Sequence, residues 1–469
     1  MSVSLPLQRA RDWATGRYEN VPSMAQDVLC SAYGVQEIVR RRGRLNDARR
    51  HIALINELHY NTESRRDLVE ARLRRILRLA RKLPGYEGVP LEDEASALEQ
   101  LSRWPFVTKG QVRNNPEAFL TRDPLSTDIF SLTSGTTGTP LNVWRTRDAF
   151  RELFRSSAAG RSWFGVELRC RRASFTGKVV VPTHSDRVWR VNLPGRQLVL
   201  SQYHLRPGTL ERYVQALRWW KPQVLDGYTS NLVELARLMK QQGLQLRIPL
   251  IVTTCEMLTE SSRALLEEVF QGRVSDKYGS SENLALAIEC KEGSRHVFEN
   301  VGLLEIIDDS GVKVPNGDHG RIVLTTLVNE LMPLVRYQIG DLGTLDAGGT
   351  CLCGRTSPVL RWIQGREDDV VVASDGRRMA LFVFNLLRGI DDALAVQVVQ
   401  RSPKHFLVRA VLAQTSADDL ARFETAIRDA FARLIGPTES LTIEFRYEDH
   451  IERTPGGKIR NVVRTFDHA

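Results

Sequence analysis

A loop rich in glycine and hydroxyl side chains offers the first chemistry that the sequence can support. The segment 131–140 reads SLTSGTTGTP and has strand-like residues on both sides. Backbone N–H groups and hydroxyls in such a flexible loop can surround a polyphosphate. It is not a Walker loop, because no Gly-Lys-Ser/Thr triplet follows. From these residues alone, a hairpin turn without function remains the alternative.

Cysteine and histidine side chains form two short clusters further along the chain. Five residues separate Cys290 from His296, and one separates Cys351 from Cys353. Three thiolates and one imidazole are typical of a closed, structural zinc site. The spacing is looser than that of a zinc finger, so buried unreactive thiols remain the alternative. With only six cysteines in 469 residues, a disulfide scaffold is excluded.

Four further segments follow the glycine-rich loop in chain order. They are DKYGSSE at 276–282, RYQIGD at 336–341, GREDD at 365–369 and PGGKIR at 455–460. Together with SGTTG at 134–138, these segments resemble the motifs of the adenylate-forming superfamily in their order and spacing. That superfamily contains acyl-CoA ligases, the adenylation domains of peptide synthetases and luciferases.

The resemblance implies a binding role for each matching residue. The ring of Tyr278 would stack on adenine, and Asp341 and Arg366 would hold the ribose hydroxyls. The residues implied in ATP binding are Ser134, Gly135, Thr136, Thr137, Gly138, Tyr278, Gly279, Ser280, Ser281, Asp341 and Arg366.

Catalytic roles are implied for two residues and a hinge role for a third. Glu282 would hold Mg²⁺, Lys458 would be inserted into the site by its loop, and Asp368 would be the pivot of a mobile C-terminal part. This assignment agrees with a physical requirement. A carboxylate that attacks the α-phosphate of ATP approaches a polyanion, so the site needs cations near the developing charge.

Within the superfamily, the chain is most similar to the phenylacetate-CoA ligase group and its CapK-like branch. The similar segments include KPQVLDGYTS at 221–230 and CLCGR at 351–355, and SQYHL at 201–205 is more like the CapK-like branch. Tyr203 and Tyr228, close to the expected acyl site, are candidates for substrate binding, with a packing role as the alternative.

The elements that must position these residues indicate an α/β protein. Short apolar runs at 179–181, 224–225 and 251–253 alternate with helical patterns, which is typical of a sheet covered by helices. We expect a large domain at 1–365, helical and basic over 1–100, with mixed sheets and a small strand region. A small mobile α+β domain at 366–469 would carry Lys458.

Charge and hydropathy limit the partners and the location. Residues 1–82 hold 17 basic and 9 acidic side chains, and the amphipathic helix predicted at 65–82 carries several of the arginines. No aromatic residues lie between these arginines, so we interpret the basic side of the helix as a solvated face rather than as a nucleic-acid-binding surface. No apolar run reaches membrane-spanning length and the first residues lack a secretory signal, so a cytoplasmic protein without a transmembrane segment is expected.

The sequence therefore predicts an ATP-dependent, AMP-forming carboxylate ligase. A small carboxylic acid and ATP would give an acyl-adenylate and pyrophosphate, with transfer to CoA as the second step. The alternatives are transfer to an amine or hydroxyl of a small molecule or sugar, and a non-catalytic nucleotide- or zinc-binding scaffold. ATP, Mg²⁺, CoA and a structural Zn²⁺ are the expected cofactors and co-substrates.

Overall fold

A computed structural model of the chain describes most of its 469 residues. Several predicted site residues lie outside the described residues, namely Ser134, Gly135, Thr136, Thr137, Gly138, Ser281, Asp368 and Lys458. Of Arg366 only the backbone is described. The described residues are 22–41, 45–89, 95–132, 141–176, 179–182, 185–256, 258–280, 282–366, 370–380, 383, 386, 390, 393–412, 416–436, 440–448, 451–452 and 460–466.

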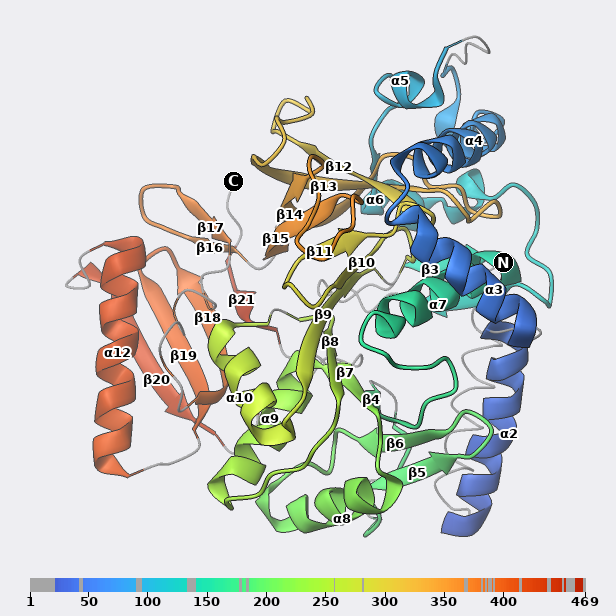
Figure 1. Ribbon diagram of the computed structural model, residues 1–469. Helices are drawn as coiled ribbons and strands as arrows, with labels where there is room; N and C mark the ends of the chain where they lie inside the picture. Colours follow the sequence, from blue (N-terminus) through green and yellow to red (C-terminus); the bar gives the residue numbers. More distant parts are fainter. Residues whose placement is uncertain are drawn as a thin grey trace.

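One large mixed sheet runs through the molecule (Figure 1). Its strand order is β12-β13-β14-β15-β11-β10-β9-β8-β7-β4-β6-β5, and β1 pairs with β14. The strands are β1 (Val107–Thr108), β4 (Arg172–Thr176), β5 (Trp189–Asn192), β6 (Gln197–Ser201), β7 (Val224–Tyr228), β8 (Leu250–Thr254), β9 (Arg273–Gly279), β10 (Leu286–Glu289), β11 (Arg295–Val297), β12 (Gly302–Ile307), β13 (His319–Thr326), β14 (Tyr337–Asp346) and β15 (Val359–Arg366).

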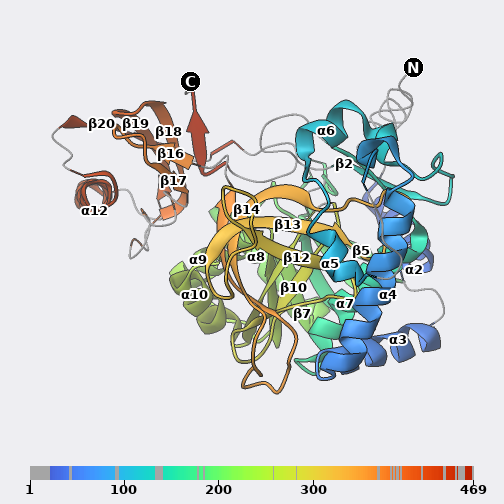
Figure 2. The ribbon, with the colours of Figure 1, turned by 90° about the horizontal axis from the view of Figure 1, so that it is seen from above.

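Five neighbouring strands of this sheet, β6, β4, β7, β8 and β9, are parallel. Helical crossovers connect β6 to β7, β7 to β8 and β8 to β9, because parallel strands need such connections. The crossover helices α8 (Leu210–Trp220), α9 (Thr229–Gln241) and α10 (Glu260–Phe270) lie on one side of these strands, and α7 (Arg147–Ser162) lies on the other (Figures 1 and 2). The last residues of the five strands form one edge, here called the carboxyl edge.

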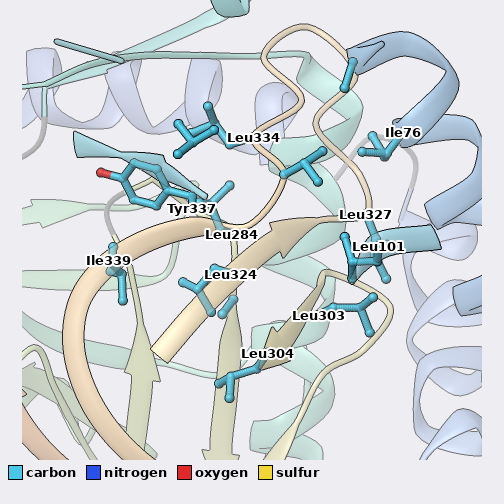
Figure 3. Close-up of a cluster of buried hydrophobic side chains, with 14 of the residues drawn as sticks. Ile76, Leu101, Leu284, Leu303, Leu304, Leu324, Leu327, Leu334, Tyr337 and Ile339 are labelled. Atoms are coloured by element: carbon cyan, nitrogen blue, oxygen red, sulfur yellow. The ribbon is translucent and has the colours of Figure 1, made fainter. Parts of the chain in front are cut away.

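The described residues between 22 and 101 form helices and turns; residues 69–101 pack on the antiparallel half of the sheet, whereas Ser31 in the first helix donates to Val191 of β5. Figure 3 shows Ile76 and Leu101 near Leu327 in the largest apolar core. The helices and short elements are α2 (Ser23–Arg41), α3 (Leu45–Leu58), α4 (Thr62–Ala80), η1 (Pro84–Tyr86), α5 (Ala97–Leu101), α6 (Lys109–Asn114) and η2 (Pro116–Phe119), with η3 (Pro207–Thr209) before α8.

The arginine-rich helix α4 corrects one expectation. Its apolar stripe is buried as predicted, but its arginines do not all lie on a solvated face. Arg65 is buried and donates to Glu299 at 2.9 Å, and Arg72 donates to Glu152 at 3.1 Å. Part of the basic charge is therefore used to attach α4 to the body of the protein.

The C-terminal residues form a second, smaller sheet with its own apolar core. It contains β18 (Ala393–Ser402), β19 (His405–Leu412), β20 (Thr442–Tyr447) and β21 (Val462–Arg464), and α12 (Ala417–Ile435) packs on it, away from the large sheet (Figure 1). Two hairpins complete the strands: β2 (Ile129–Leu132) with β3 (Asn142–Arg145), and β16 (Val370–Val372) with β17 (Arg378–Ala380).

The α/β class is confirmed, and one predicted strand is wrong. The described residues of the apolar run 179–181 are not in a strand, and the strand lies earlier, at β4. The alternating pattern of β4, RASFT, is less apolar than VVV, but Ala173, Ser174 and Phe175 are all buried. Tertiary packing decides the outcome here. Among the described residues, no helix has both the length and the apolar character needed to cross a bilayer.

Candidate active site

The glycine- and hydroxyl-rich loop connects two paired strands. Strand β2 pairs with β3 from Ile129↔Arg145 to Leu132↔Asn142, so the loop leaves and returns at the same end of a hairpin. Arg145, which is buried, donates to the hydroxyl of Ser131 at the base of this loop. Burial lowers the pKa of Arg145 to about 10, and the negative charge of Glu282 opposes this shift. Arg145 therefore places a cation close to both Ser131 and Glu282.

Three of the predicted nucleotide-binding residues lie together. The hydroxyl of Tyr278, near the end of β9, donates to Asp341 Oδ2 at 2.8 Å. Asp341, in β14, is the cross-strand partner of Arg366 in β15. Residues that are 63 and 25 positions apart in the chain thus meet at one place. The sheet brings together the aromatic ring, the carboxylate and the arginine position that the motifs predicted separately.

Glu282 lies in a tight turn that follows β9. Asn283 has a left-handed backbone (φ +57°), which Asn tolerates better than most residues, and its N–H donates to Ser280 O at 3.0 Å. Glu282 is buried, and the hydroxyl of Tyr337 donates to its Oε1 at 3.4 Å. Because Tyr337 begins β14, the same strand supports both Glu282 and Asp341.

The two predicted substrate tyrosines lie near the carboxyl edge. Tyr228 ends β7, and Tyr203 follows β6 and is 40% exposed. Burial, with smaller contributions from Cys255, Glu256 and Tyr203, raises the pKa of Tyr228 to about 12. The nearby His204 bonds Ser201 Oγ at 2.7 Å and Pro182 O at 3.1 Å, which fits a packing role.

The four predicted zinc ligands are brought together. Their ligand atoms all lie within 4.8 Å of one another, with Cys290 Sγ 4.0 Å from Cys351 Sγ and Cys353 Sγ 3.2 Å from His296 Nε2. A tetrahedral site with Zn–S bonds of about 2.3 Å has sulfur atoms about 3.8 Å apart. The four ligand atoms are therefore spaced as they would be around one zinc ion. The three cysteines are free thiols.

A tight turn and a hydrogen-bonded histidine shape this Cys/His cluster. Gly354, with φ +85°, lets the turn after Cys351 close, and its N–H donates to Cys351 O at 2.7 Å. Nδ1 of His296 lies 3.1 Å from Ser357 Oγ, which leaves Nε2 facing Cys353. Burial lowers the pKa of His296 to about 4, so the imidazole is neutral, as a ligand must be.

The Cys/His cluster and the candidate nucleotide residues share neighbouring strands. The hairpin β10–β11 carries Cys290 and His296 and is paired with β9 on one side and β15 on the other. Arg295 donates to Asp276 Oδ2 at 2.8 Å, and Asp276 also accepts from Thr253 at 2.8 Å. A metal at the Cys/His cluster would hold the β10–β11 hairpin in place between β9 and β15, the strands that carry Tyr278 and Arg366.

Sequence reasoning missed some residues that the structure adds to this site. Arg145 and Arg295 are two of 65 basic side chains, and no local motif distinguishes them. Arg145 pairs with Ile129 at the end of the β2–β3 hairpin away from the loop, and its guanidinium donates to Ser131. Predicting that hairpin would have indicated a cation on β3 opposite Ile129.

Comparison with known proteins gives consistent relatives. No family model matches the chain. The chain is 24% identical to protein CapK of Staphylococcus aureus over 390 residues (80% of this chain, 83% of CapK). It is 28% identical to phenylacetate-coenzyme A ligase of Thermus thermophilus over 421 residues (83% of this chain, 87% of the ligase).

The fold agrees with solved structures of similar length. A structure of 2-hydroxyisobutyryl-CoA ligase in the postadenylation state aligns with a TM-score of 0.66 at 20% identity, covering 84% of this chain and 88% of that one. An anthranilate CoA ligase in complex with anthranoyl-AMP aligns with a TM-score of 0.51 at 17% identity, covering 80% of this chain and 71% of that one. At these identities the likeness establishes the fold.

Proposed function

We propose that this chain activates a small carboxylic acid with ATP. The support is that it belongs to the adenylate-forming ligase superfamily as a distant homologue of phenylacetate-coenzyme A ligases and CapK. An oxygen of the carboxylate attacks the α-phosphorus, the bond to the β-phosphate oxygen breaks, and acyl-adenylate and pyrophosphate result. The observation that carries this proposal is the meeting of Tyr278, Asp341 and the Arg366 position, with the buried Glu282 in the turn that follows the strand of Tyr278.

The residues of the chain divide the work of this step. Asp341 accepts hydrogen bonds from the ribose hydroxyls, with Tyr278 orienting the carboxylate from the other side. The buried Arg145, which bonds Ser131, supplies positive charge near Glu282, and preorganised charge of this kind is effective in a buried site. Glu282 would hold Mg²⁺, which supplies charge neutralisation on the phosphates.

CoA is the acceptor that the relatives support. Several are phenylacetate-coenzyme A ligases, including those of Thermus thermophilus and Pseudomonas putida. An amine remains the second candidate, because the chain is also 26% identical to indoleacetate–lysine synthetase of Pseudomonas savastanoi over 226 residues (46% of this chain, 53% of that protein). Adding CoA or amines separately to a preformed acyl-adenylate separates the two candidates.

Zinc is proposed as a structural ion at the Cys/His cluster. The support is the donor set of three thiols and a neutral imidazole, closed by four protein ligands with no position for water. The chemistry it would supply is cross-linking of the β10–β11 hairpin to the 351–354 turn.

A hinge at Asp368 and a mobile small domain at 366–469 complete the proposal. The support is the separate core of the C-terminal sheet, whose members all follow residue 370. Rotation of this part would exchange the Lys458 loop for the acceptor nucleophile between the two steps.

Lys458→Ala tests the proposal most directly. Exchange of pyrophosphate into ATP, measured over a panel of carboxylic acids without an acceptor, should fall by at least about 10²-fold, the loss expected when one preorganised charge is removed. ATP binding should weaken much less, because Lys458 acts mainly in the transition state.

The matched control is Lys404→Ala, an exposed lysine in the same C-terminal part, which should leave the exchange unchanged. Transfer from a synthetic acyl-adenylate should survive in Lys458→Ala. Intact exchange with abolished transfer would assign Lys458 to the second step instead and contradict the placement of its loop.

A further inference from the structure

The order of the parallel strands marks one place on the carboxyl edge as a ligand crevice. Strand β4 has β6 on one side and β7 on the other, so the chain reverses its direction across the sheet at β4. In open α/β sheets, ligands bind outside the carboxyl ends of the strands at such a switch point. Here Thr176 ends β4, Ser201 ends β6 and Tyr228 ends β7.

Buried polar atoms without partners gather at this switch point. Among the described residues, six neutral side-chain atoms are buried without a hydrogen-bond partner, and two of them, Trp104 Nε1 and Asn329 Oδ1, belong to other parts of the chain. The other four all come from the ends of β4, β6 and β7 or the residues that follow: Thr176 Oγ1, Gln202 Nε2, Ser230 Oγ and Asn231 Oδ1. Unpaired buried polar atoms destabilise a fold, so these four atoms need an explanation, and a bound ligand that pairs with them would provide it.

Two of these residues form a pair with a defined preference. Asn231 is fully buried and Gln202 is 3% exposed, and Asn231 Nδ2 donates to Gln202 Oε1 at 2.9 Å. This bond uses one donor and one acceptor, and leaves an N–H on Gln202 and a carbonyl oxygen on Asn231 without protein partners. A hydroxyl group is the smallest ligand group that accepts from the first and donates to the second. An ammonium group only donates, and a methyl group does neither.

We infer that the carboxylic acid activated by this chain carries a hydroxyl group, bound between the side-chain amides of Gln202 and Asn231. The inference rests on the proposed function and deepens it, because it names the substrate class. Ser230 and Thr176 supply further hydroxyls for a polar acid. A purely apolar acid would leave all four atoms unpaired, and a site built for a hydrogen bond rejects the analogue that lacks it.

Matched pairs of acids that differ by one hydroxyl test this inference. The pairs are lactate and propionate, 2-hydroxyisobutyrate and isobutyrate, 3-hydroxybutyrate and butyrate, and mandelate and phenylacetate, each assayed by pyrophosphate exchange. In at least one pair, kcat/KM should favour the hydroxy acid by about tenfold or more. Gln202→Met and Asn231→Leu should each lower kcat/KM for that hydroxy acid and leave its partner unchanged, so that the ratio approaches one.

A second measurement does not depend on catalysis. Gln400 is a fully buried amide whose two polar atoms are both bonded, to Val372 O at 2.6 Å and Val372 N at 3.0 Å. Gln400→Met removes two buried hydrogen bonds and Gln202→Met removes one, from Asn231 Nδ2, so Gln400→Met should lower the melting temperature of the ligand-free protein more than Gln202→Met does. The hydroxy acids, added with ATP omitted, should raise the melting temperature of the wild type more than that of Gln202→Met.

The outcomes separate the inference from the proposed function. Exchange that runs equally well with both members of every pair overturns the inference and leaves the proposed function standing, and it is the result expected if a water molecule occupies the amide pair. Equal destabilisation by Gln202→Met and Gln400→Met assigns Gln202 a structural role and also overturns it. Absence of exchange with every acid, together with hydroxyl-dependent thermal shifts that Gln202→Met removes, supports the binding site and contradicts the ligase function.

Discussion

The Cys/His cluster, on the β10–β11 hairpin beside the amino-terminal half of β9, and the carboxyl edge differ in how their polar atoms are paired. At the cluster, Ser357 Oγ bonds both His59, at 2.6 Å, and His296, at 3.1 Å. At the carboxyl edge, Gln202 and Asn231 keep atoms without a protein partner. Paired buried groups stabilise a fold, whereas unpaired ones are kept where a ligand completes them.

The difference predicts separate consequences for substitutions in the two regions. Variants near the cluster should lower stability with little direct effect on the chemistry. Variants at the carboxyl edge should lower activity with little effect on stability. Four predictions follow this separation, from the largest expected effect to the smallest.

Cys351→Ser should have the largest effect, on stability and metal together. Purified wild-type protein should contain about one zinc per chain, and the variant less than about one tenth. The free energy of unfolding should fall by more than about 3 kcal/mol, because apparent zinc-binding free energies at structural sites reach about 10 to 16 kcal/mol. The control Leu352→Ser changes a 93% exposed side chain between the two cysteines and should alter neither quantity. A purified wild-type protein that contains no zinc while its thiols are reduced would contradict the zinc assignment of the Cys/His cluster.

Glu152→Gln should lower stability by about 3 kcal/mol at pH 7. Burial raises the pKa of Glu152, but the His51 hydrogen bond at 2.5 Å, the charge of Arg72 and the Asn300 amide outweigh it and bring the pKa to about 2. A fall in the pKa from the ordinary value of 4.5 to about 2 corresponds to about 3 kcal/mol, because one pKa unit corresponds to about 1.36 kcal/mol.

The sign of this effect sets its pH dependence. A lowered carboxyl pKa stabilises the fold above the unfolded value, so the contribution is complete above about pH 4.5 and is lost as the pH falls toward about 2. Denaturant unfolding of wild type and variant should therefore differ at pH 7 and converge between these values. The exposed pair Lys240–Glu268 supplies the control, since Glu268→Gln should change stability by less than about 1 kcal/mol at any pH. A difference that persists at pH 2 would contradict the charge argument.

Two buried glutamates, one in each region, sharpen the comparison. Glu282→Gln should lower pyrophosphate exchange by about 10²-fold, close to 2.7 kcal/mol, and leave the melting temperature nearly unchanged, because Gln also accepts from Tyr337. Glu289→Gln should do the reverse, since Glu289 accepts twice from Arg263 at 2.7 and 2.9 Å at the cluster end of β10. Equal losses of activity in both variants would show that the roles of the Cys/His cluster and of the carboxyl edge cannot be separated into stability and activity.

How much of this could be predicted from the sequence depended on the range of the interaction. The amphipathic period located α4 to within a few residues, and the motifs and the Cys/His spacing singled out side chains that the fold brings close together, Tyr278 with Asp341 and the four members of the Cys/His cluster. The meeting of Asp341 with Arg366 required the pairing of β14 with β15, which no local pattern encodes. The unpaired atoms of Gln202 and Asn231 were beyond reach, because two ordinary amides become distinctive only through the geometry of their partners.

The smallest effect is expected for Tyr278→Phe, which removes one hydroxyl and keeps the ring. The variant loses the hydrogen bond to Asp341, a single bond worth about 1 kcal/mol, so KM for ATP should rise roughly fivefold while kcat changes little. Stability should be unaffected, because Asp341 is only half-buried and water can replace the hydroxyl. Asp341→Asn should raise KM more, and the double variant should resemble Asp341→Asn alone, because Tyr278 acts through Asp341. Additive losses in this cycle, measured by ATP titration of the exchange reaction, would mean that the Tyr278 hydroxyl contacts the nucleotide independently of Asp341.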